Sequence, residues 1–134
     1  MLTLESIREK WRRKAAAAPP SVLIILSGAP FDGDVTWNAL RLAGTLLDRK
    51  SPVRIFVMND AMDLVRGGSM PEGAEFDLQA MLRGLLPKGA RFKICTTCVN
   101  RCGIGQGEIM PEAIMATMAD LAAWVVESDR VVVF

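Results

Sequence analysis

The run Val22–Leu26, with the sequence VLIIL, decides the fold of this chain of 134 residues. All of its residues are apolar, and the small and turn-forming residues of Ser27–Pro30 end it. Because polar residues do not alternate with apolar ones, both faces of the predicted strand are expected to be buried. Strands that are buried on both faces are typical of parallel sheets. The run therefore predicts an α/β protein.

Strands and helices alternate along the rest of the chain, with proline or glycine residues between them. This alternation predicts a mostly parallel sheet with helices on both faces and right-handed crossovers. The further predicted strands are 53–58, 91–95 and 130–134. The predicted helices contain Leu40–Leu47, Phe76–Leu86 and a last helix that starts at Pro111. On this last helix, the expected apolar side is formed by Ile114, Met118, Leu121, Ala122 and Val125.

A helix is also predicted over residues 2–18, because Leu4, Ile7 and Trp11 recur at spacings of three and four. Pro19–Pro20 would end it in an extended link. The basic side chains of this segment could dock an acidic partner. The simpler alternative is a helix that lies over the domain or a neighbouring subunit, with its charged side chains in solvent.

The composition is that of an ordinary globular protein, with 51% hydrophobic and 23% charged residues and a formal net charge of +1. We predict a helical arm and linker at residues 1–20 and one α/β domain at residues 21–134. The net charge does not indicate a nucleic-acid partner, and no apolar stretch is long enough to cross a membrane. Three cysteines without a secretory signal favour free thiols in the cytoplasm.

In an open parallel sheet, functional groups gather at the carboxyl ends of the strands. Three predicted loops lie there, namely residues 27–34, Asn59–Asp60 and Cys95–Gly103, and we expect them to share one rim. The last of these loops holds all three cysteines of a chain that has no histidine. Sulfur chemistry is therefore expected at this rim.

Cys95 is the last residue of its predicted strand, where its side chain can reach the rim. If Thr96 and Thr97 begin a helical turn, free backbone N–H groups would stabilise a thiolate at Cys95 or Cys98. Arg101 could add positive charge. Because the chain has no histidine to act as a base, a cysteine–histidine hydrolase within a single chain is excluded.

Other interpretations of the thiols stay open at this point. Cys95 and Cys98 have the spacing of a redox dithiol, and any of the cysteines could simply fill the core. Together with Cys102 they supply three metal ligands, whereas a closed zinc site or an iron–sulfur cluster needs four. A metal would therefore require a site shared between subunits.

Two further motifs suggest bound ligands less strongly. Asp32, Asp34 and Asp60 could meet at the rim and hold magnesium, although turns and helix caps use the same residue type. The segment Gly103–Glu108 is rich in glycine, but its spacing and position do not fit a dinucleotide-binding loop. We interpret it as a mobile loop over the cysteines.

The segment Lys93–Ile104, with the sequence KICTTCVNRCGI, resembles the signature of the DsrE/DsrF/TusD-like (YchN-like) sulfur-relay family. In that signature a cysteine ends a hydrophobic strand, and a turn of small residues leads to an arginine–glycine–aliphatic element. The sequence Arg41–Ala43 is similar to the family's Arg-Leu-Ala element. The resemblance covers about residues 21–134 and implies a flavodoxin-like three-layer sandwich with a mostly parallel sheet.

The resemblance implies that Cys95 takes a sulfane sulfur from a donor persulfide and passes it on. Cys98 matches the second cysteine of a Cys-x-x-Cys variant of the family. Cys102 departs from the pattern, because relatives commonly place arginine before Gly103, whereas here Arg101 lies one position earlier. The family also implies homo-oligomers that meet protein donors and acceptors of sulfur.

We therefore predict a sulfur carrier or sulfurtransferase with Cys95 as the acceptor nucleophile and Cys98 as a thiol that could resolve the persulfide. Thr96, Thr97, Arg101 and Cys102 are the expected supporting residues. No cofactor or resident metal is expected, and neither is a nucleic-acid or membrane partner. The alternative is a non-catalytic module whose thiols bind metal or sense redox state within an oligomer.

Overall fold

The computed structural model describes residues 2–134, apart from the side chains of residues 14–17 and 106. Its centre is a five-stranded sheet with the order β4-β3-β2-β1-β5, and every pairing in it is parallel. β1 lies between two other strands, which explains why its sequence is apolar throughout. The strands are β1 (Val22–Leu26), β2 (Val53–Val57), β3 (Arg91–Cys95), β4 (Ile114–Ala116) and β5 (Arg130–Val133).

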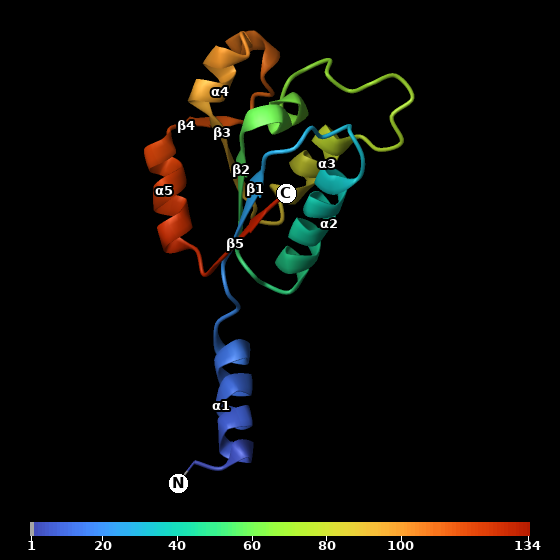
Figure 1. Ribbon diagram of the computed structural model, residues 1–134. Coiled ribbons are helices and arrows are strands. Elements are labelled where there is room, and N and C mark those ends of the chain that lie inside the picture. Colours follow the sequence, from blue (N-terminus) through green and yellow to red (C-terminus); the bar gives the residue numbers. More distant parts are fainter. Residues whose placement is uncertain (1) are drawn as a thin grey trace.

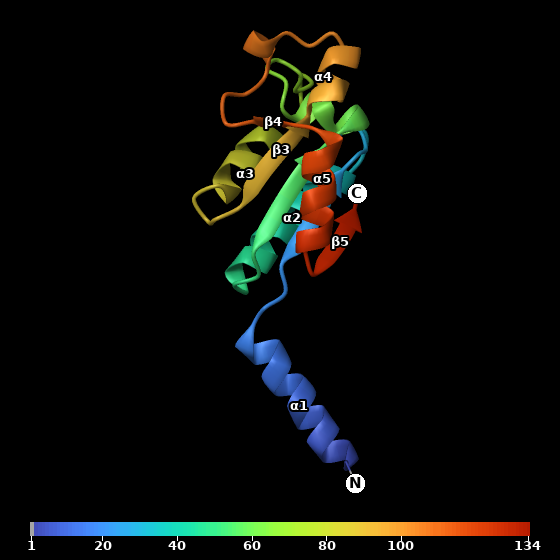
Figure 2. The same cartoon turned by 90° about the vertical axis from the view of Figure 1, so that its left-hand side faces the viewer.

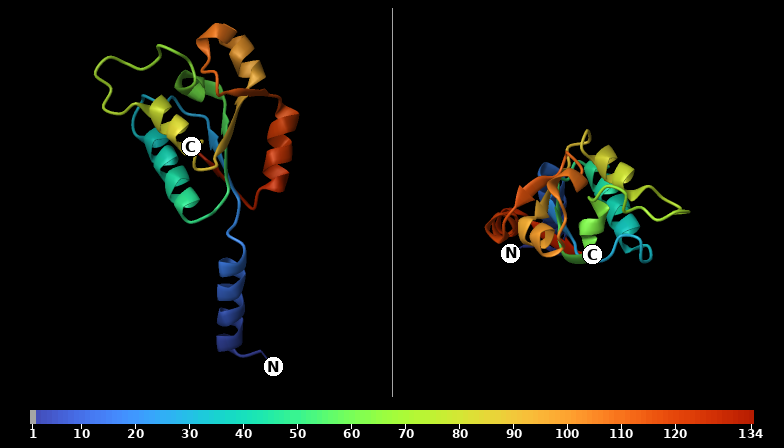
Figure 3. Two further views of the ribbon diagram at one scale, coloured as in Figure 1. Left: turned by 180° about the vertical axis from the view of Figure 1, so that it is seen from behind. Right: turned by 90° about the horizontal axis from the view of Figure 1, so that it is seen from above.

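Helices cover both faces of the sheet. α2 (Val35–Asp48) and α3 (Leu78–Leu85) lie on one face, and α5 (Met118–Glu127) lies on the other (Figure 1 and Figure 3). Side chains of β1 alternate between two hydrophobic clusters. Ile24 packs into the cluster beneath α2 and α3, and Leu23 packs into the cluster beneath α5. The predicted three-layer α/β sandwich is confirmed.

The prediction for the last helix was wrong at its start. Ile114–Ala116 forms the edge strand β4, and the helix begins at Met118 rather than at Pro111. A capping box sets this boundary. The Thr117 side chain accepts a hydrogen bond from the backbone of Asp120, and the Asp120 carboxylate accepts one from the Thr117 N–H at 2.7 Å. The chain can be extended before Thr117 because this box supplies the first hydrogen bonds of α5.

The predicted apolar side of that helix was also partly wrong. Leu121 and Trp124 are the buried residues of α5, whereas Met118 is 63% exposed and Val125 is 40% exposed. The buried side of α5 is the one that Leu121 and Trp124 share, three positions apart, and Met118 and Val125 lie beside it. Trp124 is the large side chain that closes the cluster beneath α5.

The N-terminal helix α1 (Leu4–Ala17) projects away from the sheet (Figure 1 and Figure 2). The Thr3 side chain caps it by accepting a hydrogen bond from the Ser6 N–H at 3.1 Å. Leu4 and Trp11 are 65% and 68% exposed, so the apolar stripe does not lie over the domain of its own chain. Within the part of the chain that the structure describes, no helix is long and apolar enough to cross a membrane.

Three short helices lie beyond the carboxyl ends of the strands. They are η1 (Asn59–Leu64), α4 (Thr96–Arg101) and η2 (Gln106–Glu108). The glycine-rich segment that contains η2, interpreted above as a mobile loop, is tied to the segment after η1. Gly67 donates a backbone hydrogen bond to Glu108 at 2.6 Å, and Met110 donates one to Val65 at 2.8 Å. These bonds anchor the segment beside η1.

Candidate functional site

Cys95 is at once the last residue of β3 and the N-cap of α4. Its side chain is on the face covered by α5, in a cluster with Phe56 and Trp124, and the residue is only 6% exposed. The Cys95 Sγ accepts a hydrogen bond from the Cys98 N–H at 3.3 Å. The predicted helical turn after Cys95 therefore exists, and it directs a backbone donor at this sulfur.

Cys98 is half-buried and contacts both Cys95 and the end of β2. Burial raises the pKa of the Cys98 thiol, and a side-chain hydrogen bond with Cys95 raises this pKa further. The Asn59 N–H, which lies 3.3 Å from the Cys98 Sγ, acts in the opposite direction but is outweighed. The Cys98 thiol therefore favours its protonated form more than an ordinary cysteine does.

Asn59 links the ends of three strands. Its backbone is left-handed, with φ of 53°, a conformation that asparagine tolerates better than most residues. Its N–H points at Cys98 beyond β3, and its Nδ2 donates to the Ser27 Oγ beyond β1 at 2.8 Å. The predicted common rim is confirmed. From the sequence, Asn59 was expected only as part of a loop, although asparagine directly after a buried strand was an available signal.

All three cysteines line one groove of about 510 Å³. Thr97 and Arg101 also line it, so the structure brings together five of the six predicted site residues; Thr96, which is half-buried, is not among the lining residues. The remaining lining residues come from the end of β2 and the start of α5, namely Met58, Asn59, Asp60 and Met118.

The C-terminal end of α4 explains the spacing between Cys95 and the glycine of the signature. Gly103 has a left-handed φ of 66°, its N–H donates to Asn100 at 3.2 Å, and the Ile104 N–H donates to Val99 at 3.1 Å. This pair of bonds is a Schellman motif, which favours glycine at that position. It ends the helix directly after Cys102, whose side chain is exposed.

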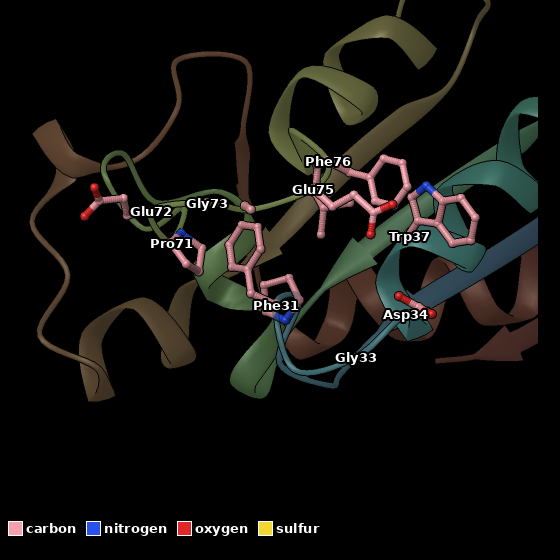
Figure 4. Close-up of a pocket in the computed structure, with 12 residues that line it drawn as sticks. Phe31, Gly33, Asp34, Trp37, Pro71, Glu72, Gly73, Glu75 and Phe76 are labelled. Atoms are coloured by element: carbon pink, nitrogen blue, oxygen red, sulfur yellow. The ribbon is translucent and has the colours of Figure 1, made fainter.

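Asp34 and Asp60, which could have shared a magnesium site with Asp32, lie in different cavities. Asp60 lines the cysteine groove, whereas Asp34 lines a second cavity of about 310 Å³. Figure 4 shows this second cavity, where Trp37 and Phe76 lie beside each other with ring centroids 4.7 Å apart. Among the described residues, no three His, Cys, Asp or Glu side chains gather closely enough to hold a metal ion.

The chain that forms this thiol groove is similar in sequence and structure to known proteins. The family model of the DsrE/DsrF-like family matches residues 21–134. This chain belongs to the DsrE/DsrF-like family. The match covers the whole α/β sandwich and begins after α1 and the prolines that follow it.

DsrE/DsrF-like relatives support this assignment over nearly their full length. The chain is 31% identical over 115 residues to the protein YchN of Escherichia coli, covering 84% of this chain and 97% of YchN. It is 32% identical over 113 residues to the protein MK0008 of Methanopyrus kandleri, covering 84% of this chain and 93% of that relative.

Solved structures share the fold. The crystal structure of YchN from E. coli superposes with a TM-score of 0.77 at 30% identity, over 86% of this chain and 99% of YchN. The protein BT1422 from Bacteroides thetaiotaomicron has a TM-score of 0.65 at 16% identity, over 85% of this chain and 95% of that protein. The second likeness shows the fold alone.

Proposed function

We propose that this protein is a sulfur carrier or sulfurtransferase that holds a sulfane sulfur as a persulfide on Cys95. The observation that carries the proposal is the setting of the Cys95 sulfur, which accepts a hydrogen bond from the Cys98 N–H at 3.3 Å in a groove that all three thiols line. A thiolate is the nucleophile in sulfur transfer, and Cys95 is a free thiol at the carboxyl end of β3. Membership of the DsrE/DsrF-like family supports the same chemistry.

The transfer needs no net oxidation. The Cys95 thiolate attacks the outer sulfur of a donor persulfide, one S–S bond forms as another breaks, and the donor leaves as a thiolate. An acceptor thiolate then attacks the outer sulfur on Cys95 and restores the Cys95 thiolate. If Cys98 instead attacks the inner sulfur of the Cys95 persulfide, which is the Cys95 Sγ, the products are a Cys95–Cys98 disulfide and hydrosulfide.

The supporting residues have distinct roles in this proposal. Thr96 and Thr97 form the first turn of α4, whose backbone places Cys98 against Cys95. Arg101 is exposed in the last turn of α4 and lines the groove, where it adds positive charge near the sulfur anions. The expected setting is a homo-oligomer in the reducing cytoplasm that meets donor and acceptor proteins. In this proposal residues 21–134 are the working domain and residues 1–20 a separate arm.

Incubation with inorganic polysulfide tests the proposal. Mass spectrometry of the cysteine peptides should find one added sulfur atom on Cys95, and Cys95→Ser should abolish this addition. Thr45→Ser, at an exposed threonine of α2 outside the groove, should load like the wild type. If Cys95 stays free of added sulfur while the rest of the protein is folded, the persulfide proposal is wrong.

The contact between Cys95 and Cys98 favours a second candidate function, that of a redox-sensing dithiol. The two candidates differ in what a mild oxidant and a persulfide donor do. A sensor should form the Cys95–Cys98 disulfide at cellular glutathione potentials and release no transferable sulfur. A carrier should transfer labelled sulfur from Cys95 to a small thiol acceptor.

A further inference from the structure

The solvent exposure of the three thiols increases along the chain from Cys95 to Cys102. Cys95 is 6% exposed, Cys98 is half-buried and Cys102 is exposed, yet all three line the same groove. They lie at positions i, i+3 and i+7, which is one side of α4 and its N-cap. The groove therefore connects solvent to the buried thiol through a row of sulfur atoms.

Burial of Cys95 limits the donors that it can meet directly. A small anion can enter a groove of about 510 Å³, but a persulfide fixed to the surface of a folded protein cannot approach a residue that is 6% exposed. Cys102 has no such restriction, because it is exposed at the C-cap of α4. Sulfur from a protein donor thus reaches Cys102 before it reaches Cys95.

The spacing of the thiols suits transfer between them. Side chains four positions apart on a helix, like those of Cys98 and Cys102, have Cβ atoms about 5–6 Å apart. A disulfide needs Cβ atoms about 3.8 Å apart, so this pair is too wide to close easily into one. When a sulfane sulfur is transferred, the moving sulfur atom lies between the two cysteine Sγ atoms. Sulfur transfer can therefore span a wider separation of the two cysteines than a disulfide can. Cys98 already packs against the cluster that contains Cys95, and its N–H lies 3.3 Å from the Cys95 Sγ.

We infer that Cys102 is the entry thiol of an internal relay, which receives a sulfane sulfur from a protein donor and passes it through Cys98 to Cys95. This inference rests on the proposed persulfide chemistry of Cys95. It assigns a role to the cysteine that stands where relatives commonly place arginine. The class of donor that it predicts is a protein-bound persulfide, and small polysulfides are expected to bypass Cys102.

Each step balances without an added oxidant or reductant. Cys98 attacks the outer sulfur of the Cys102 persulfide and gives its own proton to the Cys95 thiolate, whose cluster it packs against. Cys102 leaves as a thiolate. Cys95 then takes the same sulfur atom from Cys98 and returns the proton to Cys98. One S–S bond is broken and one is formed in each step.

The test compares two donors on the full-length protein. Albumin carrying a persulfide is the bulky donor, and inorganic polysulfide is the small one. Cys102→Ser should slow the loading of Cys95 from albumin persulfide by about tenfold or more, and should leave loading from polysulfide within about twofold of the wild type. Thr45→Ser, at an exposed threonine of α2 that does not line the groove, is the matched control and should change neither rate.

The variants Cys98→Ser and Cys95→Ser locate the sulfur along the row. With albumin persulfide, Cys98→Ser should retain the added sulfur on Cys102, and Cys95→Ser should carry it on Cys98 and Cys102. Unchanged loading of Cys95 from albumin in the Cys102→Ser variant would overturn the relay while leaving the carrier function intact. Failure of the wild type to load Cys95 from either donor would refute the carrier function, and the relay with it.

Discussion

Replacing Gly103 with alanine should destabilise the end of α4 by a predictable amount. Gly103 has φ of 66°, and an added Cβ would meet no other atom within 4 Å, so the backbone conformation alone determines the cost. A left-handed conformation costs alanine about 1–2 kcal/mol. Alanine also restricts the unfolded chain, which stabilises the folded state by about 0.4–1 kcal/mol. The centres of these two ranges give an expected net destabilisation for Gly103→Ala of about 0.8 kcal/mol.

Gly107 offers a matched control in the same segment. An added Cβ there also meets nothing within 4 Å, but the φ of Gly107 is not left-handed. Gly107→Ala should therefore stabilise the protein by about 0.4–1 kcal/mol through the unfolded state alone. The two substitutions add the same methyl group, so their difference isolates the effect of the Schellman motif that ends α4.

Urea denaturation followed by tryptophan fluorescence measures the difference. The two variants differ by the left-handed cost of about 1.5 kcal/mol, so with a denaturant slope of about 1–3 kcal/mol per M their unfolding midpoints should differ by roughly 0.5–1.5 M. Equal midpoints would refute the argument, since they would mean that the left-handed turn after Cys102 carries no energetic cost for alanine. In the relay described above, Gly103→Ala should also slow sulfur loading from albumin persulfide more than loading from polysulfide, because it disturbs Cys102 and leaves the β3 end of the groove unchanged.

Two more predictions concern protonation. At pH 8, iodoacetamide should label Cys102 before Cys98, because burial and the hydrogen bond with Cys95 raise the pKa of Cys98; equal rates would contradict the assigned contacts. The pKa of Cys98 is higher in the folded protein than in the unfolded chain. The contribution of this thiol to folding stability is therefore complete below its pKa in the unfolded chain, and it is lost as pH rises through its pKa in the folded protein. Thr117→Ala should cost about 1 kcal/mol in urea denaturation, because it removes the N-cap of α5, and Thr117→Ser should retain most of the stability. Hydrogen bonds from Thr117 lower the pKa of Asp120, so this carboxylate stabilises the fold above its unfolded pKa, and the stabilisation is lost as pH falls through the lower folded pKa. The difference between the wild type and Thr117→Ala should therefore shrink in acid, and a difference that is independent of pH would contradict the capping box.

The main elements of the sheet could be predicted because their signals are local. Val22–Leu26 is apolar at every position, and Arg91–Cys95 ends where polar residues and glycine follow, so both strands have the bounds expected from the sequence. The start of α5 was missed because a three-residue edge strand has no periodicity to detect. The Thr117 and Asp120 pair was the available signal for that boundary.

The sequence by itself determined that this chain forms a parallel α/β sheet and that a cysteine without a histidine partner ends one of its strands. Only the tertiary structure decided how the thiols differ. The contact between Asn59 and Cys98 joins residues that are 39 positions apart, and the link from Asn59 to Ser27 joins residues that are 32 positions apart. Burial and contacts of this kind arise from the packing of whole strands and helices. They make Cys95 buried, Cys98 protonated and Cys102 open to solvent, although all three lie within eight positions of one another.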